Sequence, residues 1–177
     1  MVKRLDSYRW LVALLCLGLA GPGAGTHASE RLAAHGVGAA APDFALPAAT
    51  GGNVRLSEHR GEVVVLAFWS SACGTCLSEL AALDQLQQTY RPAGLVTLAV
   101  SVEDDLVRSA RFAADHPARF PLLLDRKKSV SRAYGIERLP TTVLIDRRGR
   151  VQAVLQDFRS TDDSYVAQVR ALLDDPL

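Results

Sequence analysis

One stretch constrains the fold of this chain more than any other: an unbroken apolar run that leads into two closely spaced cysteines. Residues 63–69 read Val-Val-Val-Leu-Ala-Phe-Trp, and three residues separate them from Cys73-Gly74-Thr75-Cys76. A continuous β-branched and aromatic run of this kind is typical of a strand that is buried on both faces. Apolar residues at helical spacing follow, so we expect a helix that begins at Cys73 and ends at residues 91–94. Strand, turn and helix in this order predict an α/β domain.

The rest of the chain continues the alternation of short apolar segments and turns. Residues 44–46 and 54–56 flank Gly51-Gly52-Asn53 and predict a small N-terminal β-hairpin. Later segments predict strands at 95–102, 120–124, 141–146 and 151–155, and helices at 103–116, 129–134 and 162–173. The last two strands are joined by the short turn 147–150, so they should pair antiparallel, whereas helices separate the earlier strands. This order predicts a central mixed β-sheet with helices on both faces.

The N-terminal segment has the features of an export signal. Lys3, Arg4 and Arg9 precede an apolar run from Trp10 to Ala20, and small residues follow. We therefore interpret residues 1–28 as a signal peptide, cleaved after Thr26-His27-Ala28, or as an uncleaved N-terminal anchor. Residues 29–41 are small and polar and are expected to be a linker, and residues 42–177 to be the domain. Export predicts a periplasmic or otherwise extracytoplasmic protein.

The cysteine pattern then indicates redox chemistry. The chain has three cysteines, and Cys16 lies inside the predicted signal, which leaves Cys73 and Cys76 in the domain. A disulfide across so short a loop adds little stability, and a zinc site needs a second pair of ligands that the sequence lacks. At the start of a helix, the backbone N–H groups favour a thiolate. We expect Cys73 to be the exposed nucleophile and Cys76 the inward-facing resolving thiol.

Four short motifs together resemble a known family. They are Ala41-Pro42-Asp43-Phe44, the strand-to-cysteine run VVVLAFWSSACGTC, Tyr134-Gly135-Ile136 and Leu139-Pro140-Thr141-Thr142. Over about residues 41–175 the chain resembles the thioredoxin superfamily, and within it the TlpA/ResA-like, AhpC/TSA-related branch of exported thiol–disulfide oxidoreductases. The resemblance implies a thioredoxin-like fold, with a βα insertion between residues 104 and 125.

The same resemblance assigns roles to four more residues. It implies that Pro140 is cis and packs against the sulfurs, and that the backbone of Leu139 pairs with an extended client. It also implies that Glu79 is a buried carboxylate that takes a proton from Cys76, although a solvated glutamate on the helix surface is the alternative. Trp69 would lie beside the sulfurs and shape the surface there, or would be an ordinary core aromatic.

These expectations favour an enzyme that reduces disulfides of exported proteins. Its clients would include apocytochrome c, and a membrane electron donor of the DsbD/CcdA type would recharge it. The formal net charge of +1 without basic blocks gives no sign of nucleic-acid binding, and we expect no cofactor or bound metal.

Two alternatives stay open at this point. A thiol peroxidase has the same fold and a Thr or Ser at the position of Ser70, but it has a proline where this chain has Ala67. A copper chaperone would need a further ligand, such as a late histidine, and none follows His116.

Overall fold

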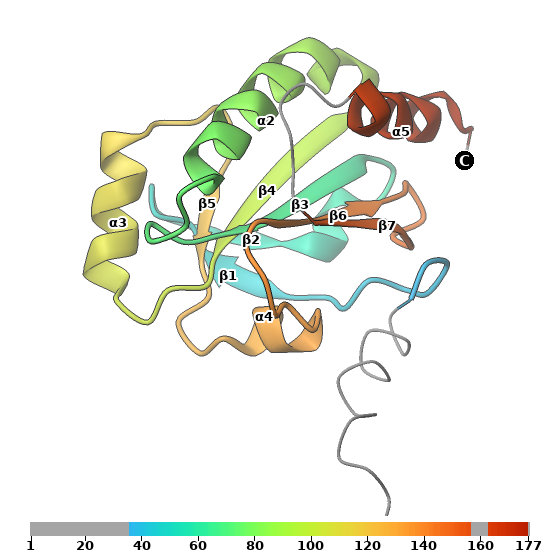
Figure 1. Cartoon of the computed structure of the whole chain (residues 1–177). Coiled ribbons are helices and arrows are strands. Elements are labelled where there is room, and N and C mark those ends of the chain that lie inside the picture. Colours follow the sequence, from blue (N-terminus) through green and yellow to red (C-terminus); the bar gives the residue numbers. More distant parts are fainter. Residues whose placement is uncertain (1–35, 157–162, 177) are drawn as a thin grey trace, which may run out of the picture.

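A five-stranded mixed sheet forms the centre of the molecule. The structure is a computed structural model that describes residues 36–156 and 163–176 (Figure 1). The strand order is β5-β4-β3-β6-β7, with bounds Leu122–Leu124, Leu95–Ser101, Val63–Trp69, Thr141–Ile145 and Val151–Gln156. β3 is parallel to β4 and antiparallel to β6, and β6 and β7 form the C-terminal hairpin. The predicted signal or anchor, residues 1–28, lies outside the described residues.

The apolar composition of β3 explains its central position in the sheet. All seven residues of β3 are buried, as the continuous apolar run predicted, because both faces of the strand are covered. Side chains alternate across the sheet, so Val64, Leu66 and Phe68 join one core cluster. Val63, Val65, Ala67 and Trp69 join the other.

Helices cover both faces, as predicted. The long helices α2 (Cys76–Tyr90) and α5 (Asp163–Asp174) lie on one face, whereas α4 (Ser129–Ala133) lies on the other (Figure 1). The antiparallel pair β1 (Ala45–Pro47) and β2 (Asn53–Arg55) and the 3-10 turn η1 (Leu56–His59) pack on the α4 face. Helix α3 (Leu106–Asp115) joins the α2 face through Phe112. A second 3-10 turn, η2 (Arg91–Ala93), closes α2. Within the described part of the chain, no helix is long and apolar enough to cross a membrane.

The chain makes strand-like contacts slightly ahead of Pro42, the predicted start of the domain. The Gly38 N–H donates to the Val151 carbonyl at 2.7 Å, and the Ala41 N–H donates to the Gly149 carbonyl at 2.9 Å. Gly149 has φ +76°, a left-handed conformation that the tight turn of the β6–β7 hairpin requires and that glycine adopts without strain. Residues 38–41, which we expected to belong to the linker, therefore pair with this hairpin before the chain continues into β1.

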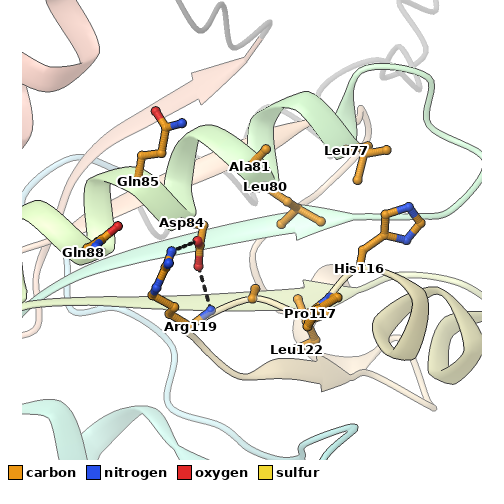
Figure 2. Close-up of a pocket in the computed structure, with 11 residues that line it drawn as sticks. Leu77, Leu80, Ala81, Asp84, Gln85, Gln88, His116, Pro117, Arg119 and Leu122 are labelled. Atoms are coloured by element: carbon orange, nitrogen blue, oxygen red, sulfur yellow. Dashed lines mark hydrogen bonds and ion pairs between the residues drawn. The ribbon is translucent and has the colours of Figure 1, made fainter.

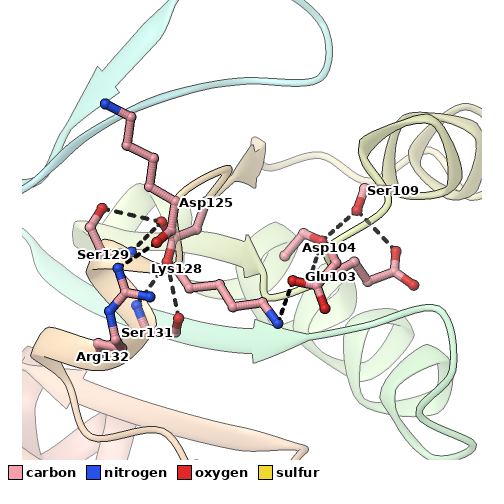
Figure 3. A network of polar contacts seen from close by, with 10 residues as sticks. Glu103, Asp104, Ser109, Asp125, Lys128, Ser129, Ser131 and Arg132 are labelled. Carbon is pink, nitrogen blue, oxygen red and sulfur yellow. Dashed lines mark hydrogen bonds and ion pairs between the residues drawn. The ribbon is translucent and has the colours of Figure 1, made fainter.

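Asp125 anchors the loop between β5 and α4, and the sequence analysis did not single it out. Its buried carboxylate accepts the backbone N–H groups of Ser129, Val130 and Ser131 at 2.8–3.0 Å, and also both serine hydroxyls (Figure 3). These N–H groups open α4 and have no partner within the helix, so the carboxylate satisfies them as a cap would. A helix of only five residues depends on such a contact.

We predict that Asp125→Ala lowers the free energy of unfolding by about 2 kcal/mol, since it orphans buried helix-start donors. Denaturant unfolding of the purified protein measures this difference. The matched control is Asp115→Ala, which removes a carboxylate from an exposed pair with Arg111 and should change stability by less than about 0.5 kcal/mol. Equal losses in the two variants would show that Asp125 contributes no more than a surface charge.

Candidate active site

The two cysteines of the motif form a disulfide at the end of the central strand. Their sulfurs are 2.16 Å apart and their Cα atoms 5.4 Å apart, in the turn that connects β3 to α2. Cys73 is partly exposed, whereas Cys76 is completely buried within the core cluster of the α2 face. This matches the expected outward and inward orientation of the two thiols. One sulfur is therefore accessible to a large partner, and the other is accessible only through the first.

The start of α2 differs from the prediction. The helix begins at Cys76, not at Cys73, and its first helical backbone bond runs from the Glu79 N–H to the Thr75 carbonyl at 3.1 Å. Residues 73–75 instead form a turn, closed by the Cys76 N–H on the Cys73 carbonyl at 3.3 Å. Gly74 and Thr75 have low helix propensity, which favours the turn over another helical residue. The sulfur of Cys73 still lies at the helix start because it is bonded to that of Cys76.

Glu79 is buried on the same side of α2 as Cys76. The residue is 1% exposed, which excludes the alternative of a solvated glutamate on the helix surface. Its Oε1 accepts the hydroxyl of Thr142 at 2.7 Å, while its buried Oε2 has no hydrogen-bond partner. Burial raises the pKa of Glu79 to about 7, and the Thr142 hydrogen bond offsets part of this rise. The carboxyl can therefore gain or lose a proton near neutral pH.

Two residues from other elements surround this carboxyl. Thr142 lies in β6, directly opposite Ala67 of β3. Tyr165 of α5 is buried, and its pKa is raised by burial and by the nearby Glu79 carboxylate, against a lowering from a hydrogen bond with Thr142. The surroundings of the Glu79 carboxyl are thus formed by elements that lie far apart in the sequence.

The peptide bond between Leu139 and Pro140 is cis, as the family resemblance implied. Pro140 is buried and directly precedes β6, where its missing N–H removes no ladder bond. Leu139 is partly buried and contacts both core clusters. Thr142, which binds Glu79, comes only two residues after the proline, so one short segment holds both the cis turn and the hydrogen-bond partner of the buried carboxyl.

Trp69 is a core residue. It is 0% exposed and packs against Phe112 of α3 with ring centroids 4.6 Å apart. Its buried Nε1 has no hydrogen-bond partner. Of the two interpretations of Trp69, the ordinary core aromatic is the one that fits this burial, because a side chain without exposed surface cannot shape the surface around the sulfurs.

A second buried carboxylate, Glu103, contacts the cysteine loop through Ser71. The sequence places it in the acidic run 103–105, which we expected to start a helix, but only Asp105 caps α3, through the Arg108 N–H at 3.1 Å. Glu103 turns inward and accepts the hydroxyls of Ser71 and Ser109. Nothing in the local pattern distinguishes it from its exposed neighbours, so sequence reasoning missed it.

Two grooves border this region. One, of about 400 Å³, is lined by residues of the cysteine loop, the β4–α3 connection and the cis turn: Ser70, Ala72, Val102, Glu103, Asp104, Asp105, Arg108 and Leu139. The other, of about 480 Å³, runs between α2 and residues 116–122, and Asp84 closes part of it by binding Arg119 (Figure 2). Leu77, next to Cys76, is 43% exposed at this second groove. Among residues 36–156 and 163–176, no three His, Cys, Asp or Glu side chains are grouped so that they could hold a metal ion.

Known proteins are similar in sequence to this chain. Residues 37–154 match the AhpC/TSA family. The thiol-disulfide oxidoreductase ResA of Geobacillus thermodenitrificans (strain NG80-2) is 36% identical over 127 residues, which are 72% of this chain and 73% of ResA.

Solved structures extend the similarity to the fold. A Chlorobium tepidum protein described as a thiol:disulfide interchange protein DsbE superposes with a TM-score of 0.73 and 38% identity, over 78% of this chain and 98% of that one. A Bacteroides thetaiotaomicron protein described as a protein disulfide isomerase superposes with a TM-score of 0.70 and 26% identity, over 79% and 91%. With a disulfide at the end of the central strand and relatives of this kind, the chain belongs to the AhpC/TSA family of thioredoxin-like proteins and is a thiol–disulfide oxidoreductase.

Proposed function

We propose that this oxidoreductase works outside the cytoplasm as a reductant of disulfides in exported proteins. The observation that carries this proposal is the asymmetry of the site, with a partly exposed Cys73, a buried Cys76 and a buried carboxyl three residues further along the helix. Such an arrangement suits a reaction in which a client reaches only the first sulfur and the second one completes the exchange.

In the first step, the Cys73 thiolate of the reduced protein attacks a client disulfide. A bond forms between Cys73 and one client sulfur, and the other client sulfur leaves as a thiolate and takes up a proton. The start of α2 stabilises the attacking thiolate, because its first N–H groups have no partner within the helix. Of the two sulfurs only Cys73 is accessible, so the mixed disulfide forms there.

In the second step, Cys76 attacks Cys73 and releases the client as a free thiol. Glu79 accepts the Cys76 proton, through the Oε2 that has no other partner. A carboxyl with a pKa of about 7 suits this role, because near neutral pH both its ionised form, which accepts a proton, and its protonated form are populated. The product is the Cys73–Cys76 disulfide, the form that the structure shows.

The client would bind across the cis turn. An extended segment can pair with the backbone of Leu139, and the ring of Pro140 would separate the backbone from the sulfurs. The adjoining groove of about 400 Å³ offers Ala72 and Leu139 as apolar contacts for side chains next to the client cysteine. Since Trp69 is buried, its part is to support the loop from below.

After each reaction with a client, the disulfide of such a reductant must be reduced again, and an oxidising compartment does not supply the electrons. The proposed source is a membrane dithiol donor of the DsbD/CcdA type, which would reduce the Cys73–Cys76 disulfide by the same two steps in reverse. The similarity to ResA and to DsbE-like proteins supports exported clients, and apocytochrome c before haem attachment is the specific client we propose. Residues 1–28 would direct export, by cleavage or as an anchor.

We predict that Cys76→Ala accumulates mixed disulfides with clients, because it removes the thiol that resolves them. The variant should carry Cys16→Ser as well, so that every adduct runs through Cys73. Acid-quenched extracts, separated without reductant and analysed by mass spectrometry, would identify the trapped proteins. The matched Cys73→Ala variant in the same background should trap nothing. Equal trapping by both variants would contradict the assignment of Cys73 as nucleophile.

The direction of electron flow is a separate prediction. A reductant should equilibrate with glutathione at a reduction potential closer to that of thioredoxin, about −270 mV, than to that of the oxidant DsbA, about −120 mV. Quantifying dithiol and disulfide forms across a series of glutathione ratios gives the value. A potential near that of DsbA would reject the assignment as a reductant, but it would not contradict the assignment as a thiol–disulfide oxidoreductase.

The pKa of Glu79 predicts how stability depends on pH. Its value of about 7 lies above the ordinary 4.5, so the folded protein binds this proton more tightly than the unfolded chain does. The contribution of Glu79 is most favourable below pH 4.5 and falls as the pH rises to about 7, by about 3 kcal/mol in total. Glu79→Gln should therefore gain stability relative to the wild type over this interval, in unfolding curves of the oxidised proteins.

The control for this experiment is Glu58→Gln, which changes an exposed glutamate of η1 at the opposite end of β3. It should keep the pH dependence of the wild type. Parallel curves for the wild type and Glu79→Gln between pH 4.5 and 7 would mean that Glu79 does not hold its proton in the folded protein.

A further inference from the structure

We propose that Glu103 is a positioning residue of the redox site, which fixes the cysteine loop through Ser71 and whose charge favours the disulfide over the dithiol. Glu103 lies in the connection between β4 and α3 and is 9% exposed. Its Oε1 accepts the hydroxyl of Ser71, and its Oε2 accepts the hydroxyl of Ser109 at 2.9 Å. Ser71 is only two residues before Cys73, so this contact holds the loop that carries the nucleophile.

The hydrogen bonds around Glu103 close into a ring with a defined direction. The Ser101 hydroxyl oxygen accepts the Glu103 N–H at 3.4 Å and lies 2.7 Å from the Ser109 hydroxyl oxygen. Since Ser109 donates its proton to Glu103, Ser101 must donate to Ser109. Both carboxylate oxygens are thereby acceptors, one from each serine neighbour, which is the pattern of an ionised carboxylate.

The serines of this hydrogen-bonded ring belong to two regular elements, strand β4 and helix α3. Ser101 ends β4 opposite Trp69, the last residue of β3, and the Val102 N–H donates to the Trp69 carbonyl at 2.9 Å. Ser109 is completely buried in α3. The carboxylate of Glu103 is therefore held by rigid elements, and it transmits this rigidity to the otherwise irregular loop through Ser71.

Glu103 lines the same groove as Arg108, but its neighbours form the ion pairs here. Asp104 pairs with Lys128 at 2.6 Å, as Figure 3 shows, and Asp105 pairs with Arg108 at 3.9 Å. Within the described parts of the chain, no such ion pair involves Glu103. Glu103 and Ala72 line the same groove as Leu139, which places the charge on the side of the site that a client would occupy.

A fixed negative charge near Cys73 changes the redox balance. Reduction of the disulfide by two glutathione thiols gives two cysteine thiols and one glutathione disulfide, and part of the Cys73 population is then thiolate. Like charges repel, so Glu103 destabilises that thiolate and shifts the equilibrium back toward the disulfide. A more stable disulfide makes the dithiol a stronger reductant. The inference rests on the proposed role of Cys73 as nucleophile.

The test compares the wild type with Glu103→Gln and Ser71→Ala. Glu103→Gln removes the charge, so we expect about fivefold faster alkylation of Cys73 by iodoacetamide at pH 7 and an equilibrium with glutathione shifted about fivefold toward the dithiol. Ser71→Ala leaves the charge in place but breaks the tether, so hydrogen exchange of residues 70–75 should speed up. Asp104→Asn is the matched control, since it removes a neighbouring charge that is already paired, and its shift should be smaller.

The outcomes separate the two proposals. A wild-type protein whose Cys73 resists alkylation in the dithiol form would contradict the proposed function itself. The role of Glu103 would be overturned if Cys73 of the wild type is reactive but a folded Glu103→Gln variant shows the same alkylation rate and the same equilibrium with glutathione. It would also be overturned if Asp104→Asn shifted these two quantities as much as Glu103→Gln does. Should Glu103→Gln fail to fold, unchanged hydrogen exchange in Ser71→Ala would overturn it instead.

Discussion

The burial of one carboxyl group is the constraint on which the proposed mechanism depends. Glu79 is buried three residues after Cys76 in α2, with a single hydroxyl bound to one carboxyl oxygen and no hydrogen-bond partner on the other. Such a site is unfavourable for a charge, and it raises the pKa of the group to about 7. In the proposed mechanism this unfavourable burial has a use, because a carboxyl with a pKa of about 7 can exchange a proton near neutral pH.

The fold buries two carboxylates next to the cysteine segment, Glu79 in α2 and Glu103 against Ser71, and gives them different environments. Glu79 has an apolar surrounding and one neutral donor, whereas Glu103 has a serine hydroxyl on each oxygen. The first is suited to moving a proton during exchange, and the second, as we propose, to holding the loop and its charge constant. β3 ends at Trp69 and leads into loop 70–75, which reaches α2, the helix of Glu79, and contacts Glu103 through Ser71.

The sequence allowed much of this architecture to be predicted, for physical reasons that can be stated. The run 63–69 required a doubly covered strand, and hydrophobic spacing predicted most elements to within two residues of their bounds. The cis bond at Pro140 followed from family resemblance and not from local physics. The predicted start of α2 was wrong, because at Gly74 and Thr75 a non-helical turn and a helical turn are close in free energy. Glu103 was missed because its partner Ser71 lies 32 residues away, and no periodic pattern reports such a contact.

The central claim is that Glu79 holds a proton close to neutral pH, and it can be observed at the group itself. Carbon-13 NMR of the oxidised protein, labelled at glutamate side-chain carboxyls, follows each carboxyl through a pH titration, and Glu79→Gln identifies the signal. Our account predicts one carboxyl with a midpoint of about 7 that is absent from the variant. If the signal assigned to Glu79 instead titrated near 4.5, the carboxylate would be too weak a base to hold a proton taken from Cys76 near neutral pH, and its role as proton acceptor would be contradicted.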